Sequence, residues 1–364
     1  MIVVEHHASI AALARDWERL ADRAHASPFQ RPGWITAWAT AFAGGHLDVL
    51  AARRDGELCG VLPTVRRAGV VRSAANAHTP AADVLAEDDA TVAALLAAVY
   101  ATRPKAVALT HLADPTAARA AARTARYRLA ERPLPPAPYL DVHTTLDDYL
   151  RPRRRLMADL RRRRRRLQEQ GDRVTLDHDG TLDELLALEA LGWKGARRSA
   201  IAARPSTLDF YTNITKQAAA RDTLRIFTLR LDGRPLAALL ALEDNHVLHL
   251  LKTGFDPTFA RFSPGQTVLA AAIAHAHDAG LGRVELGQGT EPYKLVWTDT
   301  TTQRVALTAY APKPLADLAW ATAAHGRPLA QRAGLDRLLR PGRDRLLALY
   351  DVAQQRLRGG PTPH

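Results

Sequence analysis

Residues 224–242 read LRIFTLRLDGRPLAALLAL. Two largely apolar runs flank the dipeptide Asp232-Gly233, which favours the tight turn of a β-hairpin. Residues 47–65, LDVLAARRDGELCGVLPTV, align with this stretch without a gap, so that Asp55-Gly56 matches Asp232-Gly233. In both places the hairpin follows helical segments and precedes a further strand and helix. The offset of 177 residues between positions 47 and 224 therefore predicts an internal duplication, because solenoid repeats are far shorter.

The spacing of apolar and turn residues predicts a mixed α/β chain. Helices are expected at about 9–24, 31–42, 88–102, 151–167, 181–195, 206–220 and 265–278. Strands are expected within the two hairpins and at about 106–112, 173–179, 246–254 and 283–287, with an extended Pro-rich segment at 131–142. We expect three regions, which are an N-terminal unit at 1–148, a second unit at 149–312 and a helical appendage with a polar tail at 313–364.

Composition restricts the class of protein. The 364 residues are 47% hydrophobic and 24% charged, which is typical of a globular chain. No run approaches the ~18 apolar residues that a membrane span needs. The N-terminal sequence MIVVEHHASI lacks the features of a signal peptide, and Cys59 is the only cysteine. We therefore expect a cytoplasmic protein without a disulfide or a thiolate metal cluster.

The net charge of +12 is concentrated in one segment. Residues 151–167, RPRRRLMADLRRRRRRL, contain ten Arg and one Asp. Leu156, Leu160 and Leu167 are spaced to form one stripe on a helix, which predicts that this side docks on the protein. The arginines then form either a solvated surface or a contact for an acidic partner, such as an acyl carrier protein. We do not expect nucleic-acid binding, because the run lacks aromatic residues and resembles no known nucleic-acid-binding module.

A candidate anion site lies in residues 259–276, FARFSPGQTVLAAAIAHA. The first amides of a helix are unpaired and its dipole is positive there, so a helix N-terminus attracts anions. Gly265 allows a phosphate close to the backbone, and Pro264 is tolerated in the first turn. Arg261 adds a fixed charge. Ordinary helix capping is the alternative, but the position between two apolar strands favours an anion site.

The order of these elements resembles the GCN5-related N-acetyltransferase (GNAT) fold. HLLKTGFDPTFARFSPGQTVL (249–269) and ELGQGTEPYKLVWTD (285–299) resemble the CelD-like, cellulose-biosynthesis branch more closely. SPFQRPGWITAWATAF (27–42) and LRRRRRRLQEQGD (160–172) fit this branch too. The branch is similar to FemABX transferases in having two GNAT-like units, and the resemblance covers about residues 20–312. It implies two tandem GNAT-like domains, the first of them degenerate.

The resemblance implies an acyl-donor site in the second unit and an acceptor cleft shaped partly by the first. The pyrophosphate loop would be formed by Arg261, Phe262, Ser263, Pro264, Gly265, Gln266 and Thr267. The spacing from Arg261 to Gly265 is one residue longer than is usual in the family. Tyr293 falls where many GNAT enzymes carry the tyrosine that protonates the departing thiolate. Packing beside Trp297 is an equally good interpretation of Tyr293.

The implied reaction is direct attack of an amine on an acyl-CoA thioester, carrying an acetyl group or a longer chain, or on an acyl-carrier-protein thioester. It needs a base and backbone donors for the oxyanion. Candidate acid–base residues are His249, Glu285 and Glu291. His249 fits a structural role in an apolar strand better, and Glu291 could equally be a charge at the start of the helix that carries Tyr293.

Lys252 and Lys294 flank the same cleft and could contact donor phosphates or an anionic acceptor. Trp193 and Lys194 are expected to form a wall on the acceptor side, and simple packing at a helix end is an equally good interpretation of them.

Other classes of function stay open at this point. A FemABX-like enzyme would take its acyl group from aminoacyl-tRNA, and the Arg-rich segment could bind that RNA. A non-catalytic binding protein on the same fold is a third possibility. No spacing of His or Cys predicts a metal site. The sequence does not identify the amine acceptor, which could be a small molecule, a peptide or a saccharide.

Overall fold

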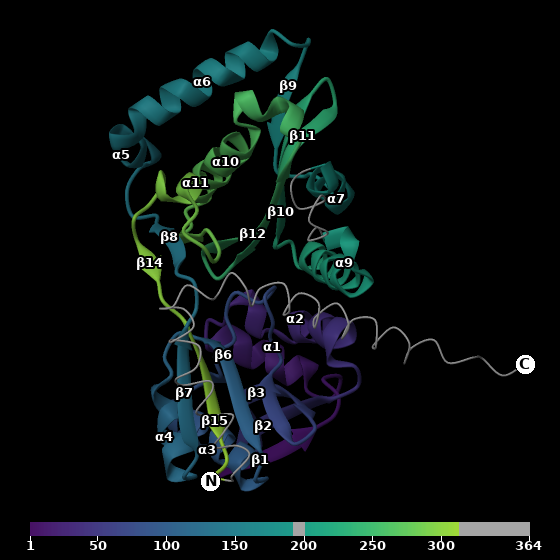
Figure 1. The fold of residues 1–364 in the computed structure, drawn as a ribbon, viewed down its shortest axis with the longest axis vertical. Helices are drawn as coiled ribbons and strands as arrows, with labels where there is room; N and C mark the ends of the chain where they lie inside the picture. Colours follow the sequence, from purple (N-terminus) through teal and green to yellow (C-terminus); the bar gives the residue numbers. More distant parts are fainter. Residues whose placement is uncertain (192–200, 313–364) are drawn as a thin grey trace, which may run out of the picture.

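The structure is a computed structural model, and it describes residues 1–191 and 201–312. The described elements form two bodies, each built on one sheet flanked by helices (Figure 1). This confirms the expected mixed α/β fold. The end of the predicted helix 181–195 and the predicted appendage 313–364 lie outside the described residues.

The first sheet has the spatial order β1-β2-β3-β4-β6-β15-β7, and β5 pairs with β3. Its strands are β1 (Ile2–His7), β2 (Leu47–Arg54), β3 (Glu57–Arg67), β4 (Val70–Ser73), β5 (Leu85–Ala86), β6 (Ala106–Leu112), β7 (Arg128–Pro133) and β15 (Val305–Tyr310). The helices of this part are α1 (Ala14–Arg23), α2 (Pro32–Trp38), α3 (Asp89–Ala101) and α4 (Thr116–Thr124). Strand β1 was not predicted.

The second sheet has the order β14-β8-β13-β12-β11-β10-β9. Its strands are β8 (Ala137–Asp141), β9 (Val174–Asp177), β10 (Leu224–Leu231), β11 (Arg234–Asp244), β12 (Val247–Phe255), β13 (Arg283–Glu285) and β14 (Thr301–Thr302). The helices are α5 (Leu146–Leu150), α6 (Arg154–Gln168), α7 (Leu182–Leu191), α9 (Pro205–Ala220), α10 (Pro264–Asp278) and α11 (Pro292–Leu295).

The two hairpins share their turn geometry. The dipeptides Asp55-Gly56 and Asp232-Gly233 all have φ between 51° and 88°, as the two central residues of a type I′ turn require. The second strand of each hairpin also carries one extra residue at the aligned position, Cys59 in β3 and Leu236 in β11. The predicted hairpins are therefore confirmed, and the duplication extends to a matching irregularity in each.

The offset of the duplication continues beyond the hairpins. In the first sheet Val70 of β4 pairs in parallel with Ala106 of β6, and in the second Val247 of β12 pairs in parallel with Arg283 of β13. The members of these pairs again differ by 177 residues. A helix follows the earlier strand in each pair, α3 in the first body and α10 in the second. Each body thus contains two parallel strands joined by a helical crossover.

The two bodies exchange strands. β8, which ends the first half of the chain, pairs antiparallel with β13 in the second sheet. β15, which follows the second half, inserts between β6 and β7 of the first sheet (Figure 1). Each sheet therefore contains one strand that comes from the other half of the chain. The domain boundary at 148/149 stays a prediction. Each sheet contains strands from both sides of this position.

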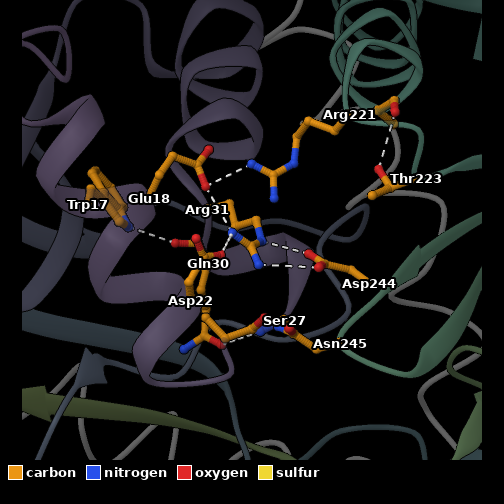
Figure 2. A network of polar contacts seen from close by, with 12 residues as sticks. Trp17, Glu18, Asp22, Ser27, Gln30, Arg31, Arg221, Thr223, Asp244 and Asn245 are labelled. Atoms are coloured by element: carbon orange, nitrogen blue, oxygen red, sulfur yellow. Dashed lines mark hydrogen bonds and ion pairs between the residues drawn. The ribbon is translucent and has the colours of Figure 1, made fainter.

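A hydrophobic cluster and an ion network join the bodies. The cluster contains Trp34 and Trp38 of α2 together with Phe210 and Tyr211 of α9. Figure 2 shows the network, whose centre is Arg31, a residue only 5% exposed.

Arg31 donates from Nε to Oδ2 of Asp244 at 2.6 Å and from Nη2 to Oδ1 at 3.2 Å. Its Nη1 donates to Glu18 at 2.9 Å and to Asp22 at 2.8 Å. Arg221 reaches the same Glu18 carboxylate. Because Asp244 ends β11 while Arg31 precedes α2, this network fixes how the two bodies meet.

Candidate active site

The cavity lies where two strands of the second sheet separate. β12 pairs with β13 only over Val247–His249, opposite Arg283–Glu285, and then continues to Phe255 paired with β11 alone. A cavity of about 740 Å³ occupies this region. Its walls come from β12, the N-terminus of α10, the segment after β13, α9 and a loop of the first body at 77–80. A volume of this size is typical of small-molecule sites.

The N-terminus of α10 faces this cavity through Ser263, Pro264, Gly265 and Gln266. Ser263 adopts the left-handed conformation, with φ 52° and ψ 50°, and this turns the chain from the preceding 3₁₀ helix into α10. The amides of Gln266 and Thr267 donate to the Ser263 carbonyl. The Gly265 amide has no acceptor within the described segments, so the predicted helix mouth presents an open donor to the cavity.

The fold itself does not require glycine at position 265. Its φ is not positive, and a Cβ placed there would meet only Cδ1 of Phe255, at 3.6 Å, an ordinary van der Waals contact. The absence of a side chain therefore matters for the space in front of the backbone, where a ligand can approach the amide.

Gln266 holds the opposite wall in place. Its Oε1 accepts from the indole Nε1 of the fully buried Trp297 at 2.7 Å, and its Nε2 donates to the Tyr293 carbonyl at 2.9 Å. Tyr293 itself lines the cavity and is 46% exposed. Desolvation, followed by the Glu291 charge, raises the pKa of the Tyr293 hydroxyl to about 12. This hydroxyl is therefore protonated at neutral pH.

Lys294 organises the loop after β13. Its ammonium donates to the carbonyls of Gly287, Gln288 and Gly289 at 3.3, 2.8 and 3.2 Å and pairs with Glu291 at 2.9 Å. Both glycines have positive φ, 74° and 98°, which lets these carbonyls converge on one ammonium. Lys294 and Glu291 line the cavity, but the ammonium already has these four partners.

A further polar group points to a ligand. Nε2 of Gln288 is buried and makes no hydrogen bond of ordinary geometry in the described part of the chain, although the side chain lies beside His111 and the residue lines the cavity. Buried polar groups are normally paired. A ligand with an acceptor atom would satisfy it.

Three residues of the predicted loop do not line the cavity. The Arg261 side chain donates to Oε1 of Gln170 at 3.2 Å and stacks on Phe262. Phe262 is buried in the core under α10, and the Thr267 hydroxyl donates to the Ser263 carbonyl. The loop thus offers its backbone to the cavity, with the Arg261 charge turned outward.

Helix α6 supports this loop from outside. Arg163 donates to the Arg261 carbonyl and to the Ser263 hydroxyl, both at 3.0 Å. The predicted leucine stripe docks as expected, since Leu160 and Leu167 are buried and Leu156 packs against the same core. Seven arginines of α6 are exposed, namely Arg154, Arg155, Arg161, Arg162, Arg164, Arg165 and Arg166. Figure 1 shows α6 running outside α10, along the edge of the second body.

Two of the predicted acid–base residues lie away from the cavity walls. Glu285 contacts Arg283 at 3.6 Å, and burial raises the pKa of its carboxyl against the opposing effect of that arginine. His249 packs edge-on against Phe29 with 5.0 Å between ring centroids. Burial lowers the pKa of His249 to about 3, so its ring is neutral. Of the three candidates only Glu291 lines the cavity.

Sequence reasoning missed several wall residues, among them His78, Tyr211, Leu251 and Gln288. His78 lies in the first-body loop SAANAHTPAADV, which carries no recognisable motif, and Tyr211 looks like an ordinary apolar-face residue of α9. In the first body, the cavity beside β3 and β4 has only about 20 Å³. The predicted acceptor contacts Trp193 and Lys194 lie outside the described residues.

The described residues contain no helix long and apolar enough to cross a bilayer. They also contain no group of three or more His, Cys, Asp or Glu side chains placed to hold a metal ion.

Comparison with known proteins matches residues 154–295 to the family model described as an acetyltransferase (GNAT) domain. This segment runs from α6 to α11 and thus contains every second-body element that contributes to the cavity. No curated protein matches the chain in sequence.

Three solved structures have a similar fold. The structure of FemX shares 11% identity, with a TM-score of 0.58 over 87% of this chain and 100% of that one. The C-terminal domain of a putative lysylphosphatidylglycerol synthetase from Agrobacterium fabrum shares 16%, with a TM-score of 0.51 over 86% and 98%. A conserved protein of unknown function from Bacteroides thetaiotaomicron shares 12%, with a TM-score of 0.52 over 85% and 100%.

The match to the family model shows that the segment around the cavity is similar in sequence to the acetyltransferase domain of the GNAT superfamily.

Proposed function

We propose that the protein is an N-acyltransferase that moves an acetyl or longer acyl group from an acyl-CoA thioester to an amine. The observation that carries the proposal is the 740 Å³ cavity at the N-terminus of α10, within the segment that matches the acetyltransferase domain. The open Gly265 amide and the unpaired Nε2 of Gln288 fit a ligand rich in phosphate and amide oxygens. Within the GNAT superfamily, we propose that the chain belongs to the CelD-like branch.

In this proposal the α10 N-terminus binds the donor's pyrophosphate, and the thioester lies where β12 and β13 separate. β12 has an irregularity here, since Leu250 pairs with Ala241 while Lys252 pairs with Leu240. Leu251 is the extra residue, and its amide is a candidate donor to the oxyanion because a bulge takes it out of the regular ladder.

The amine nitrogen forms a bond to the acyl carbon as the carbon–sulfur bond breaks. We assign removal of the amine proton to Glu291, directly or through water, because it lines the cavity. The protonated Tyr293 hydroxyl gives its proton to the departing thiolate, and the proton that Glu291 takes from the amine is returned through water to the Tyr293 phenolate. Gln266 positions Tyr293 by binding its carbonyl.

The exposed arginines of α6 favour a second candidate, in which the donor is an aminoacyl-tRNA. They form a basic surface on the helix that contacts the donor loop through Arg163. Phosphate contacts on such a surface give binding that weakens steeply with salt. An acidic acyl carrier protein is the other large donor that we propose for this surface.

Calorimetric titration of the full-length protein with acetyl-CoA, a long-chain acyl-CoA and uncharged tRNA tests the proposal. Saturable thioester binding that Gly265→Leu abolishes supports acyl-CoA as donor. If neither thioester binds while tRNA binds tightly and salt-sensitively, the aminoacyl-tRNA candidate replaces it. Replacing Arg164, Arg165 and Arg166 with Gln then reduces tRNA binding. The same changes leave acetyl-CoA binding intact if only the second-body cavity holds the donor.

A further inference from the structure

The strands give the proposed donor site a direction. β12 leaves β13 after His249, where we place the thioester, and runs on to Phe255. Phe255 lies beside the N-terminus of α10, because its Cδ1 is 3.6 Å from where a Cβ of residue 265 would lie. Gln266 ties the other side of this N-terminus to α11 through the Tyr293 carbonyl. A donor with its thioester at the strand separation and its pyrophosphate at the α10 N-terminus therefore extends its nucleotide outward, towards the segment before α10.

Two elements flank the α10 N-terminus on this outer side. The 3₁₀ helix η5 (Pro257–Phe262) leads into α10 and carries Arg261, and α6 packs on η5. Arg163 of α6 donates to the Arg261 carbonyl and to the Ser263 hydroxyl. Oε1 of Gln170, just after α6, accepts from the Arg261 side chain at 3.2 Å. The nucleotide of a bound donor would therefore lie over η5 and the adjoining side of α6.

Arg166 of α6 lies between these two contacts. It follows Arg163 by three residues and precedes Gln170 by four, and residues at these spacings are neighbours on a helix surface. Because Arg163 and Gln170 both reach the segment 261–263, Arg166 is on the side of α6 that adjoins this segment. The Arg166 and Arg261 side chains are both exposed.

These two guanidinium groups are not neutralised by a carboxylate in the described part of the chain. Arg261 donates to the uncharged Gln170 amide, and Arg166 makes no ion pair among residues 1–191 and 201–312. Asp159 is the one acidic residue within α6, and it pairs with Arg163 at 2.6 Å. The outer side of the donor loop thus carries two positive charges that are open to solvent.

We propose that Arg166 and Arg261 bind the 3′-phosphate on the ribose of the donor nucleotide, outside the cavity. The inference rests on the proposed acyl transfer from acyl-CoA and names two specificity-determining residues for that donor. A phosphate monoester carries nearly two negative charges at neutral pH, which two guanidinium groups match. The planar guanidinium also donates two parallel hydrogen bonds to a phosphate, which an ammonium does not.

This assignment changes the roles that the sequence suggested. The pyrophosphate meets the α10 backbone at the open Gly265 amide, and the Arg261 side chain reaches the nucleotide beyond it. Lys252 takes no part, because it lines the cavity with its ammonium 5.5 Å from the centroid of the Tyr211 ring. An acyl carrier protein holds its acyl group on phosphopantetheine without this nucleotide, so the contact favours a free CoA thioester as donor.

Calorimetric titration of the full-length protein with acetyl-CoA and acetyl-3′-dephospho-CoA tests the proposal, because the two probes differ only in the 3′-phosphate. We expect acetyl-CoA to bind about five- to thirtyfold more tightly, the range for two solvent-exposed charge pairs. The double variant with Arg166→Gln and Arg261→Gln should bind both probes equally. Its affinity for acetyl-3′-dephospho-CoA should equal that of the wild type, which a merely structural role of these arginines would not predict.

Arg15→Gln is the matched control for the loss of one positive charge, since Arg15 is an exposed arginine of α1 outside the cavity. It should keep the full preference for acetyl-CoA. Equal affinity of the wild type for the two probes, or a preference that survives in the double variant, would overturn the proposal. Binding of both probes without preference counts against this inference alone, whereas no binding of either counts against acyl-CoA as donor and removes the inference with it.

Discussion

Replacing Gly265 with alanine should separate ligand binding from stability. A Cβ at this position would meet Cδ1 of Phe255 at 3.6 Å, so the folded chain accommodates it without rearrangement. Gly-to-Ala changes within helices stabilise by about 0.5–1 kcal/mol, and position 265 lies in the first turn of α10. We therefore expect a free energy of unfolding that is unchanged or slightly raised.

The same methyl group should weaken donor binding, because it occupies the space in front of the open Gly265 amide. Loss of one hydrogen bond to a charged phosphate costs about 1.5–3 kcal/mol. This corresponds to a rise of about 10- to 150-fold in the dissociation constant for acetyl-CoA. Calorimetric titration measures the binding, and urea denaturation measures the stability of the same preparation.

Gly282→Ala is the matched control. Its Cβ would likewise have room, 3.7 Å from the His246 carbonyl, and Gly282 does not line the cavity. This variant should bind acetyl-CoA like the wild type. An unchanged dissociation constant in Gly265→Ala, or a loss of stability that accounts for weaker binding, would refute the assignment of the α10 N-terminus to the donor.

Three further predictions concern the reaction, the junction of the bodies and acid stability. Tyr293→Phe should lower kcat by about 10²–10⁴-fold while leaving the affinity for acetyl-CoA unchanged, and a free-thiol assay measures this. Arg31→Met should lower the free energy of unfolding by about 3–5 kcal/mol, because it leaves Asp244 buried without its partner. Urea denaturation should show little change for the control Arg19→Met, whose exposed side chain pairs with Asp16 at the surface. The free energy of unfolding should be constant above about pH 6.5. Below it, each neutral buried histidine should lower this free energy by up to about 1.4 kcal/mol per pH unit as the pH falls towards 4. The reason is that these histidines bind a proton at higher pH in the unfolded chain than in the folded one. Thermal unfolding across this range tests the effect of the three histidines whose pKa burial lowers to about 4, 4 and 3, which are His78, His111 and His249.

The sequence by itself determined the elements whose signals are local. Each Asp-Gly dipeptide specified its turn because both residues tolerate positive φ. The Ser-Pro-Gly segment placed the start of α10 and its open amide, and the leucine spacing of α6 predicted which side docks. The internal duplication was readable for the same reason, since turn chemistry and apolar spacing act over a few residues at a time.

The tertiary structure alone decided what depends on distant contacts. Sequence did not reveal that β8 joins the second sheet or that β15 joins the first. The reason is that a strand's own pattern does not encode which strand it pairs with. His78 and Tyr211 meet across 133 positions of the chain, so no local motif joins them. From sequence, Lys294 was predicted to contact a ligand, but in the structure its ammonium donates to three backbone carbonyls. A residue's type limits its chemistry, but packing of the two bodies decides which face it occupies and whether a ligand can reach it.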